Sequence, residues 1–117
     1  MGNNGTEVTI ELKYADQIFH GKAPCGVGEH AQMMAAANAL VDAINSIIPT
    51  PIVTRVAEIQ QVRFQSVAEL VIVTLVGIRI KGQEALFSGS AKVSGQLLQT
   101  VVRATLDAVN RPIGMVL

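Results

Sequence analysis

Hydrophobic and polar residues alternate at the start of the chain and then change to a helical spacing. Residues 8–14 read VTIELKY, with apolar side chains at every second position, which predicts a half-buried β-strand. The dipeptide at 15–16 predicts a tight turn, and QIFHGKA at 17–23 predicts a returning strand. Over residues 29–47 the apolar positions recur at helical intervals, and the prolines that follow end this predicted helix.

The second part of the chain predicts three more strands and a second helix. Residues 53–64 mix apolar and charged side chains, as in an exposed or edge strand, whereas AELVIVTLVGIRI at 68–80 is almost continuously apolar. Such a run is typical of a central strand that is covered on both faces or buried at an interface. ALFSGSAKV at 85–93 predicts a further strand. The last helix is expected from about Ser94, as its N-cap, to residue 110, before a proline.

The two halves of the chain resemble each other. VTIELKYADQIFHGKA at 8–23 can be laid without gaps on VGIRIKGQEALFSGSA at 76–91, and LVDAIN at 40–45 matches TLDAVN at 105–110. The offset is 68 residues in the hairpins and 65 in the helices, so three extra residues fall inside PCGVGEH in the first half. We therefore predict an internal duplication, with one repeat over about 8–48 and the other over about 53–113.

The expected architecture is a single domain over residues 1–117 of class α+β. Its element order would be β-β-α followed by β-β-β-α, with one antiparallel sheet and two helices on one face. Hydrophobic residues make up 50% of the chain and aromatic residues only 3%. The core is therefore expected to consist of Ala, Val, Ile and Leu.

The charge pattern makes some function classes less probable than others. The formal net charge is +0 and the nine Lys and Arg residues are scattered, which argues against nucleic-acid binding. A neutral, strongly apolar chain favours self-association. The longest apolar run, about nine residues, is too short to cross a membrane. The single cysteine cannot form an internal disulfide, which fits the cytoplasm.

Residues 19–30, FHGKAPCGVGEH, contain the only cysteine and both histidines of the chain. Their H-x4-C-x4-H spacing is not a standard zinc spacing, and no motif orients a Cys-His nucleophile, so we expect neither a metal, a cofactor nor a catalytic residue. The GVG stretch before the helix could offer backbone N–H groups to an anion. It lacks the dinucleotide and P-loop fingerprints, however, and the glycines are explained by a strand-to-helix turn.

The first helix lacks a polar face in its amino-terminal half. Its Met and Ala side chains there predict core packing, or else contact with a second chain or with a small apolar ligand. If a ligand binds, we expect it at the two strand-to-helix corners and the adjoining methionines. These candidate ligand-binding residues are Gly26, Gly28, Glu29, His30, Met33, Met34, Ser94 and Gly95.

The carboxyl-terminal segment carries a family resemblance. LFSGSAKVSGQLLQTVVRATLDAVNRPI, residues 86–113, resembles the end of the regulatory (dimerisation) domain of 2-isopropylmalate synthases, where a "TG.G" strand leads into a helix ending in "AxxxALNR". The residues at matching places are Gly89, Ser94, Ala104, Leu106, Ala108, Asn110 and Arg111. The resemblance implies a pseudo-symmetric βββα fold, dimerisation through it, and leucine bound close to the dimer interface as a feedback inhibitor.

These observations lead to one functional expectation and several alternatives. We expect a non-catalytic regulatory or assembly module that forms a homo-oligomer, such as a dimer, and binds a small effector such as an amino acid near its corners. The alternatives are a purely structural protein–protein interaction module, an RNA-binding domain, because two helices on a sheet also bind double-stranded RNA, and a small enzyme that uses Cys25 or the histidines.

Overall fold

The computed structural model describes residues 6–47, 53–65, 68–78 and 83–114 of the chain. Its elements are β1 (Thr6–Tyr14), β2 (Gln17–Cys25), α1 (Glu29–Ile47), β3 (Val53–Phe64), β4 (Ala68–Ile78), β5 (Glu84–Lys92) and α2 (Leu97–Gly114). The predicted α+β class and the predicted order of elements are confirmed. The prolines expected to end the first helix lie outside the described residues.

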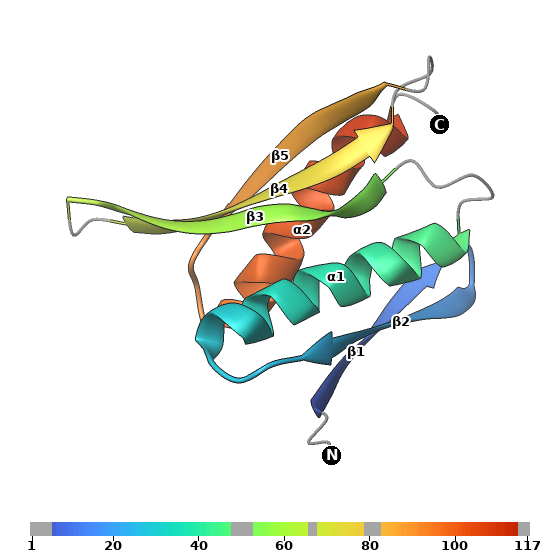
Figure 1. Cartoon of the computed structure of the whole chain (residues 1–117), viewed down its shortest axis with the longest axis horizontal. Coiled ribbons are helices and arrows are strands. Elements are labelled where there is room, and N and C mark those ends of the chain that lie inside the picture. The colour runs from blue at the N-terminus through green and yellow to red at the C-terminus, as the bar shows by residue number, and fades with distance from the viewer. Residues whose placement is uncertain (1–5, 48–52, 66–67, 79–82, 115–117) are drawn as a thin grey trace.

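The strands form two antiparallel sheets, whereas the sequence predicted a single sheet with both helices on one face. One sheet is β1-β2 and the other is β3-β4-β5, with β4 in the middle. Figure 1 shows α1 between these two sheets, where it contacts β1 and β2 on one side and β3 on the other, whereas α2 contacts β4, β5 and α1. The reason lies in α1, which buries apolar side chains on opposite faces, Ala35 and Ala39 toward β2 and Leu40 and Ile44 toward the main core.

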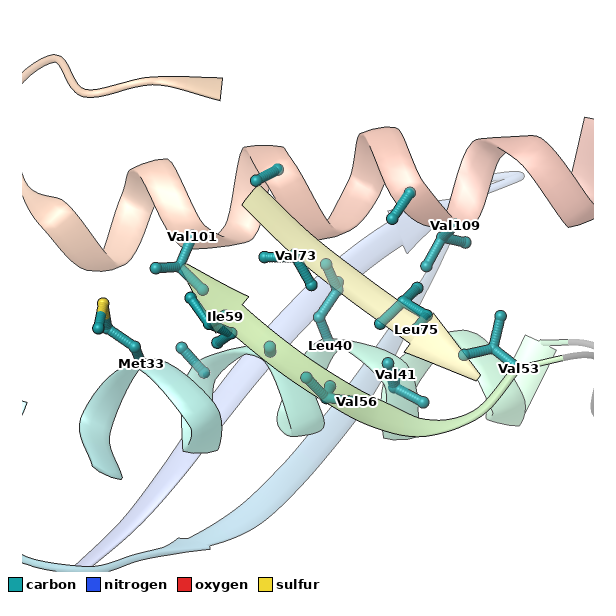
Figure 2. Close-up of a cluster of buried hydrophobic side chains, with 14 of the residues drawn as sticks. Met33, Leu40, Val41, Val53, Val56, Ile59, Val73, Leu75, Val101 and Val109 are labelled. Carbon is teal, nitrogen blue, oxygen red and sulfur yellow. The ribbon is translucent and has the colours of Figure 1, made fainter. Parts of the chain in front are cut away.

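The main core fills the space between the helices and the three-stranded sheet. Figure 2 shows short branched side chains from α1, β3, β4 and α2 meeting there, among them Leu40, Val56, Leu75 and Val101. Leu40 and Leu75 are at most 1% exposed. The expectation of a core of Ala, Val, Ile and Leu is confirmed, and small side chains allow helices and strands to approach closely.

The strand pairing corrects the gapless overlay of the two halves. Gly21 pairs with Ile10 in the first hairpin, whereas Gly89 pairs with Val73 in the second. The counterpart of Ile10 is therefore Val73 and not Ile78. The overlay was wrong in this strand because the second hairpin has a longer connection, from Ile78 to Glu84, than the two-residue turn between β1 and β2.

The boundaries of the second helix also differ from the prediction. It begins at Leu97, and the backbone N–H of Thr100 donates to Gln96 O at 3.2 Å, so Ser94 is not its N-cap. Ser94 instead precedes Gly95, whose φ of 73° turns the chain into the helix. The helix continues to Gly114, past the proline at which we expected it to stop. The proline lacks the backbone N–H that would donate to the residue four positions before it, so the last turn has one hydrogen bond fewer.

Candidate protein interface

A pair of structural contacts recurs in the two halves and explains the repeated sequence motif. A Cβ placed on Gly21 would collide with the backbone of Ala39 and Ala43, and one on Gly89 with the backbone of Ala104 and Ala108. Both pairs keep the offsets of 68 residues in the strand and 65 in the helix that the sequence gives. Glycine in the strand thus lets each helix approach the strand backbone closely.

The repeated aspartate has an equally specific place. The backbone N–H of Lys22 donates to Asp42 Oδ2 at 3.0 Å, and that of Ser90 donates to Asp107 Oδ2 at 3.1 Å. In each half, a helix carboxylate therefore satisfies an N–H at the free edge of a strand. Because unpaired strand edges invite pairing with other chains, these aspartates protect β2 and β5. The Asp and Ala that LVDAIN and TLDAVN share therefore have structural roles, the Asp as acceptor for a strand N–H and the Ala at the close approach to the strand glycine.

The three extra residues of the first half form an additional turn of helix. With the helix offset of 65, Leu97, where α2 begins, corresponds to Gln32, yet α1 begins at Glu29. Glu29 and His30 are exposed in this turn, and Gly28 before it has a φ of 106° with open space around it. Gly26 lies on the same corner and is also exposed. The two corners thus differ in helix length.

The candidate ligand-binding residues divide between the core and the surface. Met33 is only 3% exposed and belongs to the main core, so core packing is confirmed for this side chain, and Met34 is half-buried against the core. Ser94 and Gly95 are exposed at the other corner. Figure 2 shows Met33 and Val101 at the same end of the molecule, so both helices begin at that end.

The reactive side chains of residues 19–30 have local, ordinary partners. The thiol of Cys25 donates to the carbonyl of the adjacent Gly26 at 3.3 Å. His20 Nδ1 lies 4.0 Å from Glu11 Oε2 on the exposed face of the β1-β2 sheet. Within the described part of the chain, no group of three or more His, Cys, Asp or Glu residues could hold a metal ion.

The outward faces of the two sheets differ in chemistry. On the β1-β2 sheet the outward side chains are mainly polar and exposed: Glu7, Thr9, Glu11, Lys13, His20 and Lys22. On the β3-β4-β5 sheet the inward side chains Val71, Val73 and Leu75 are fully buried, but most of their outward neighbours on β4 are apolar as well, with Thr74 as the exception. Only the β1-β2 sheet has the pattern of a sheet with one face toward water.

We call the outward surface of β3-β4-β5 the apolar sheet face. Leu86 is 67% exposed and Phe64 50% exposed, and both lie on this face. The remaining outward apolar side chains, which are half-buried, are Val62, Leu70 and Ile72. Val76, beside Leu86, is already buried at 4% exposure. The register thus places Leu86 beside Val76 at one end of the face and Ile72, Leu70, Val62 and Phe64 toward the other end. Exposed apolar side chains grouped on one face mark an interaction site more often than free surface.

The centre and the rim of the apolar sheet face are polar. In the centre, the hydroxyls of Thr74 and Ser88 lie 3.1 Å apart and hydrogen-bond across the strands. At the rim, Arg55 and Glu58 on β3 and Glu84 and Lys92 on β5 are all exposed. Opposite charges are thus available on both edges of the sheet, and the hydroxyls of Thr74 and Ser88 separate the apolar side chains at its two ends. Apolar side chains bordered by charged residues are typical of protein interfaces.

Part of this face was visible in the sequence. The continuous apolar run over β4 indicated a strand covered on both faces or buried at an interface, and the structure covers one face only. The contributions of Val62, Phe64 and Leu86 were missed, because single apolar residues on edge strands carry no signal until the strand register is known.

Comparison of the chain with protein families, characterised proteins and solved structures gave no match. The resemblance to regulatory domains of 2-isopropylmalate synthases therefore rests on the sequence only, most strongly on segment 86–113 and weakly on residues 6–113. Neither helix, over the residues that the structure describes, has the length and apolar character needed to span a membrane.

Proposed function

We propose that this protein is a non-catalytic assembly module that forms a homodimer by packing two apolar sheet faces against each other. The observation that carries the proposal is the contrast between the two sheets of one chain. The β1-β2 sheet keeps polar side chains on its outward face, whereas β3-β4-β5 presents Leu86, Phe64 and Ile72 there. Packing two such sheets face to face would give an ordinary β-sandwich interface.

The charges on the rim favour a second copy as the partner. Arg55 and Glu84 carry opposite charges on opposite edges of the sheet and lie toward the same end of it, since Arg55 pairs with Val76 and Glu84 with Ile78 on β4. A twofold rotation about an axis along β4 brings the β3 edge over the β5 edge of the second copy. Arg55 then approaches Glu84 of the second copy, and the neutral chain does not repel itself.

The size of the face sets the expected affinity. Nine residues of β5 span about 30 Å at ~3.3 Å per residue, and three strands span about 14 Å at ~4.8 Å each. The flat area is therefore about 400 Å² per copy, or roughly 800 Å² for the pair, which is below the ~1,200–2,000 Å² of stable interfaces and within the range of weak, transient ones. We expect a reversible dimer with a micromolar dissociation constant.

Sedimentation velocity over a concentration series tests the proposal. The wild-type chain should move from 12.4 kDa toward twice that mass as its concentration rises through the micromolar range. Leu86→Glu should stay monomeric, because it places a charge on the apolar sheet face, and it should fold normally because Leu86 is 67% exposed in one chain.

Ile18→Glu is the matched control. Ile18 is 58% exposed on the outward face of the other sheet, so this change adds the same charge outside the proposed interface and should leave the dimer intact. A wild-type chain that stays monomeric at roughly millimolar concentration, or a dimer lost in Ile18→Glu and kept in Leu86→Glu, would refute the proposal.

A further inference from the structure

The two halves of the chain differ at one strand position. β4 pairs with β5 on one side and with β3 on the other. Its counterpart in the first half is β1, because Ile10 and Val73 both pair with the repeated glycine. Among the strands that the structure describes, β1 pairs only with β2. The edge of β1 that corresponds to the β3 side of β4 is therefore open.

The hydrogen bonds identify the backbone groups at this open edge. The N–H of Lys22 points away from β1, since it donates to Asp42 on the other side of β2. Lys22 is paired with Thr9, so this is a non-hydrogen-bonded pair, in which the N–H and C=O of both residues point away from each other. The backbone groups of Thr9, and at a period of two those of Glu7 and Glu11, therefore face the open edge.

A helix surface beside this edge is incompletely covered. On α1, the side chains of Met33, Ala37 and Val41 form a stripe at intervals of four residues and are 3%, 0% and 4% exposed. β3 crosses α1 on this side, and Figure 2 shows Val56 close to Val41. With the offset of 65, the equivalent residues on α2 are Leu98, Val102 and Leu106.

The equivalent stripe on α2 is apolar but only partly buried. Leu98 and Val102 are half-buried and Leu106 is 38% exposed, whereas the stripe on α1 is closed by β3. An open strand edge and an uncovered apolar stripe therefore occur together, where the internal symmetry would place a third strand. Backbone pairing and apolar side-chain contacts are the two components of strand addition.

We propose that an extended segment of another protein binds here as a third strand, antiparallel to β1 and across α2. Its apolar side chains at alternate positions would pack on Leu98, Val102 and Leu106. Its outward positions favour Lys or Arg, because Glu7 and Glu11 are the acidic neighbours on β1 and opposite charges across strands stabilise pairing.

A single strand fits this place better than a second folded copy does. In a β1–β1 pairing, the second copy's α1 would come with its strand, since α1 packs directly beneath β1 and β2. Adjacent strands are only ~4.8 Å apart, whereas a helix with its side chains is about 10 Å wide. The second copy's α1 would therefore collide with α2.

The segment VTRVAEIQQVRF, residues 53–64, is the natural probe because it occupies the equivalent position on α1. A labelled peptide of this sequence should bind the wild-type chain saturably in fluorescence anisotropy. A second peptide with Lys at the positions of Val56 and Ile59, which face the core, should not bind. Absence of saturable binding by the first peptide, or equal binding by both, would overturn the proposal.

Two variants separate the backbone and side-chain components. Thr9→Pro removes an N–H from the open edge and leaves the β1–β2 hydrogen bonds, which come from the alternate residues, whereas Thr9→Val keeps that N–H. Leu106→Glu puts a charge into the stripe, and Gln99→Glu puts one on the exposed side of the same helix. Thr9→Pro and Leu106→Glu should each weaken peptide binding at least about tenfold, and both controls should bind like wild type.

Hydrogen exchange on the wild-type chain gives an answer even if Thr9→Pro does not fold. The peptide should slow the hydrogen exchange of the backbone amides of Glu7, Thr9 and Glu11, and unchanged exchange rates at these amides would overturn the proposal. Peptide binding does not depend on the proposed dimer, so the Leu86→Glu variant should still bind the peptide. If instead Thr9→Pro abolishes self-association and Leu86→Glu does not, a second copy occupies the open edge and the peptide proposal is wrong.

Discussion

Replacing Gly89 by alanine tests the close approach of strand and helix that recurs in both halves. An alanine Cβ at this position would collide with Ala108 N and would lie 2.5 Å from Ala104 O and 2.7 Å from Ala108 Cα. All three are backbone atoms of α2, so no side chain can rotate away to relieve the contact. Strand β5 and helix α2 must separate instead.

The cost follows from the size of this separation. Ordinary contacts begin near 3.4 Å, the distance that a Cβ on Gly26 would keep from Ala31 Cβ, so β5 and α2 must move apart by at least about 1 Å. A gap of that size forfeits a quarter to a half of the dispersion energy between the two layers, and overpacking alone typically costs about 1–3 kcal/mol. We expect a total loss of about 3–4 kcal/mol in the free energy of unfolding, or roughly 10–20 °C in Tm.

Denaturant unfolding followed by circular dichroism, with calorimetry in parallel, measures this loss. Gly21→Ala should cost a similar amount, because its Cβ meets the equivalent backbone of Ala39 and Ala43. Gly26→Ala is the control and should stay within about 0.5 kcal/mol of wild type. A Gly89→Ala protein that loses less than about 1 kcal/mol at an unchanged denaturant slope would contradict the packing described above.

Two further substitutions test the core and the strand edges. Met33→Ala should lower the free energy of unfolding by about 2–5 kcal/mol, because the side chain is buried in the core. Met34→Ala, at a half-buried position, should lower it by less than half as much in the same measurement. Equal losses in the two variants would contradict the placement of Met33. Asp42→Ala should lower the free energy of unfolding by about 1 kcal/mol and speed hydrogen exchange at Lys22, because the Asp42 carboxylate accepts a hydrogen bond from the Lys22 N–H. Unchanged exchange at Lys22 would show that the carboxylate does not protect the edge of the strand.

The sequence predicted the elements because local patterns determine them. The helix expected at 29–47 has these bounds in the structure, and the strand at 53–64 is an edge strand as its mixed composition indicated. The tight turn at Ala15-Asp16 has positive φ angles of 52° and 63°, as a two-residue hairpin of type I′ requires. These features depend on neighbouring residues only.

The arrangement of the sheets depends on contacts that the sequence does not display. Two separate sheets form because α1 needs cover on two faces, a fact that appears only once Ala39 and Leu40 are placed in different apolar clusters. The pairing of β4 with β5 shows that the gapless overlay of the two halves is displaced in β4. A gapless comparison of sequences cannot detect this displacement, because it makes no allowance for a longer connection between strands. The place of Leu86 on the apolar sheet face was missed for the same reason, because only the strand register shows that it lies beside Val76.

The most direct test of the account is an isotope-filtered NOE experiment on a dimer mixed from labelled and unlabelled chains. The proposed interface predicts intermolecular NOEs from the methyl groups of Leu70, Ile72 and Leu86 and none from Ile18 on the other sheet. A dimeric sample in which these three side chains show no intermolecular NOEs, or in which Ile18 shows them, would contradict the claim that β3-β4-β5 is the surface through which this chain assembles.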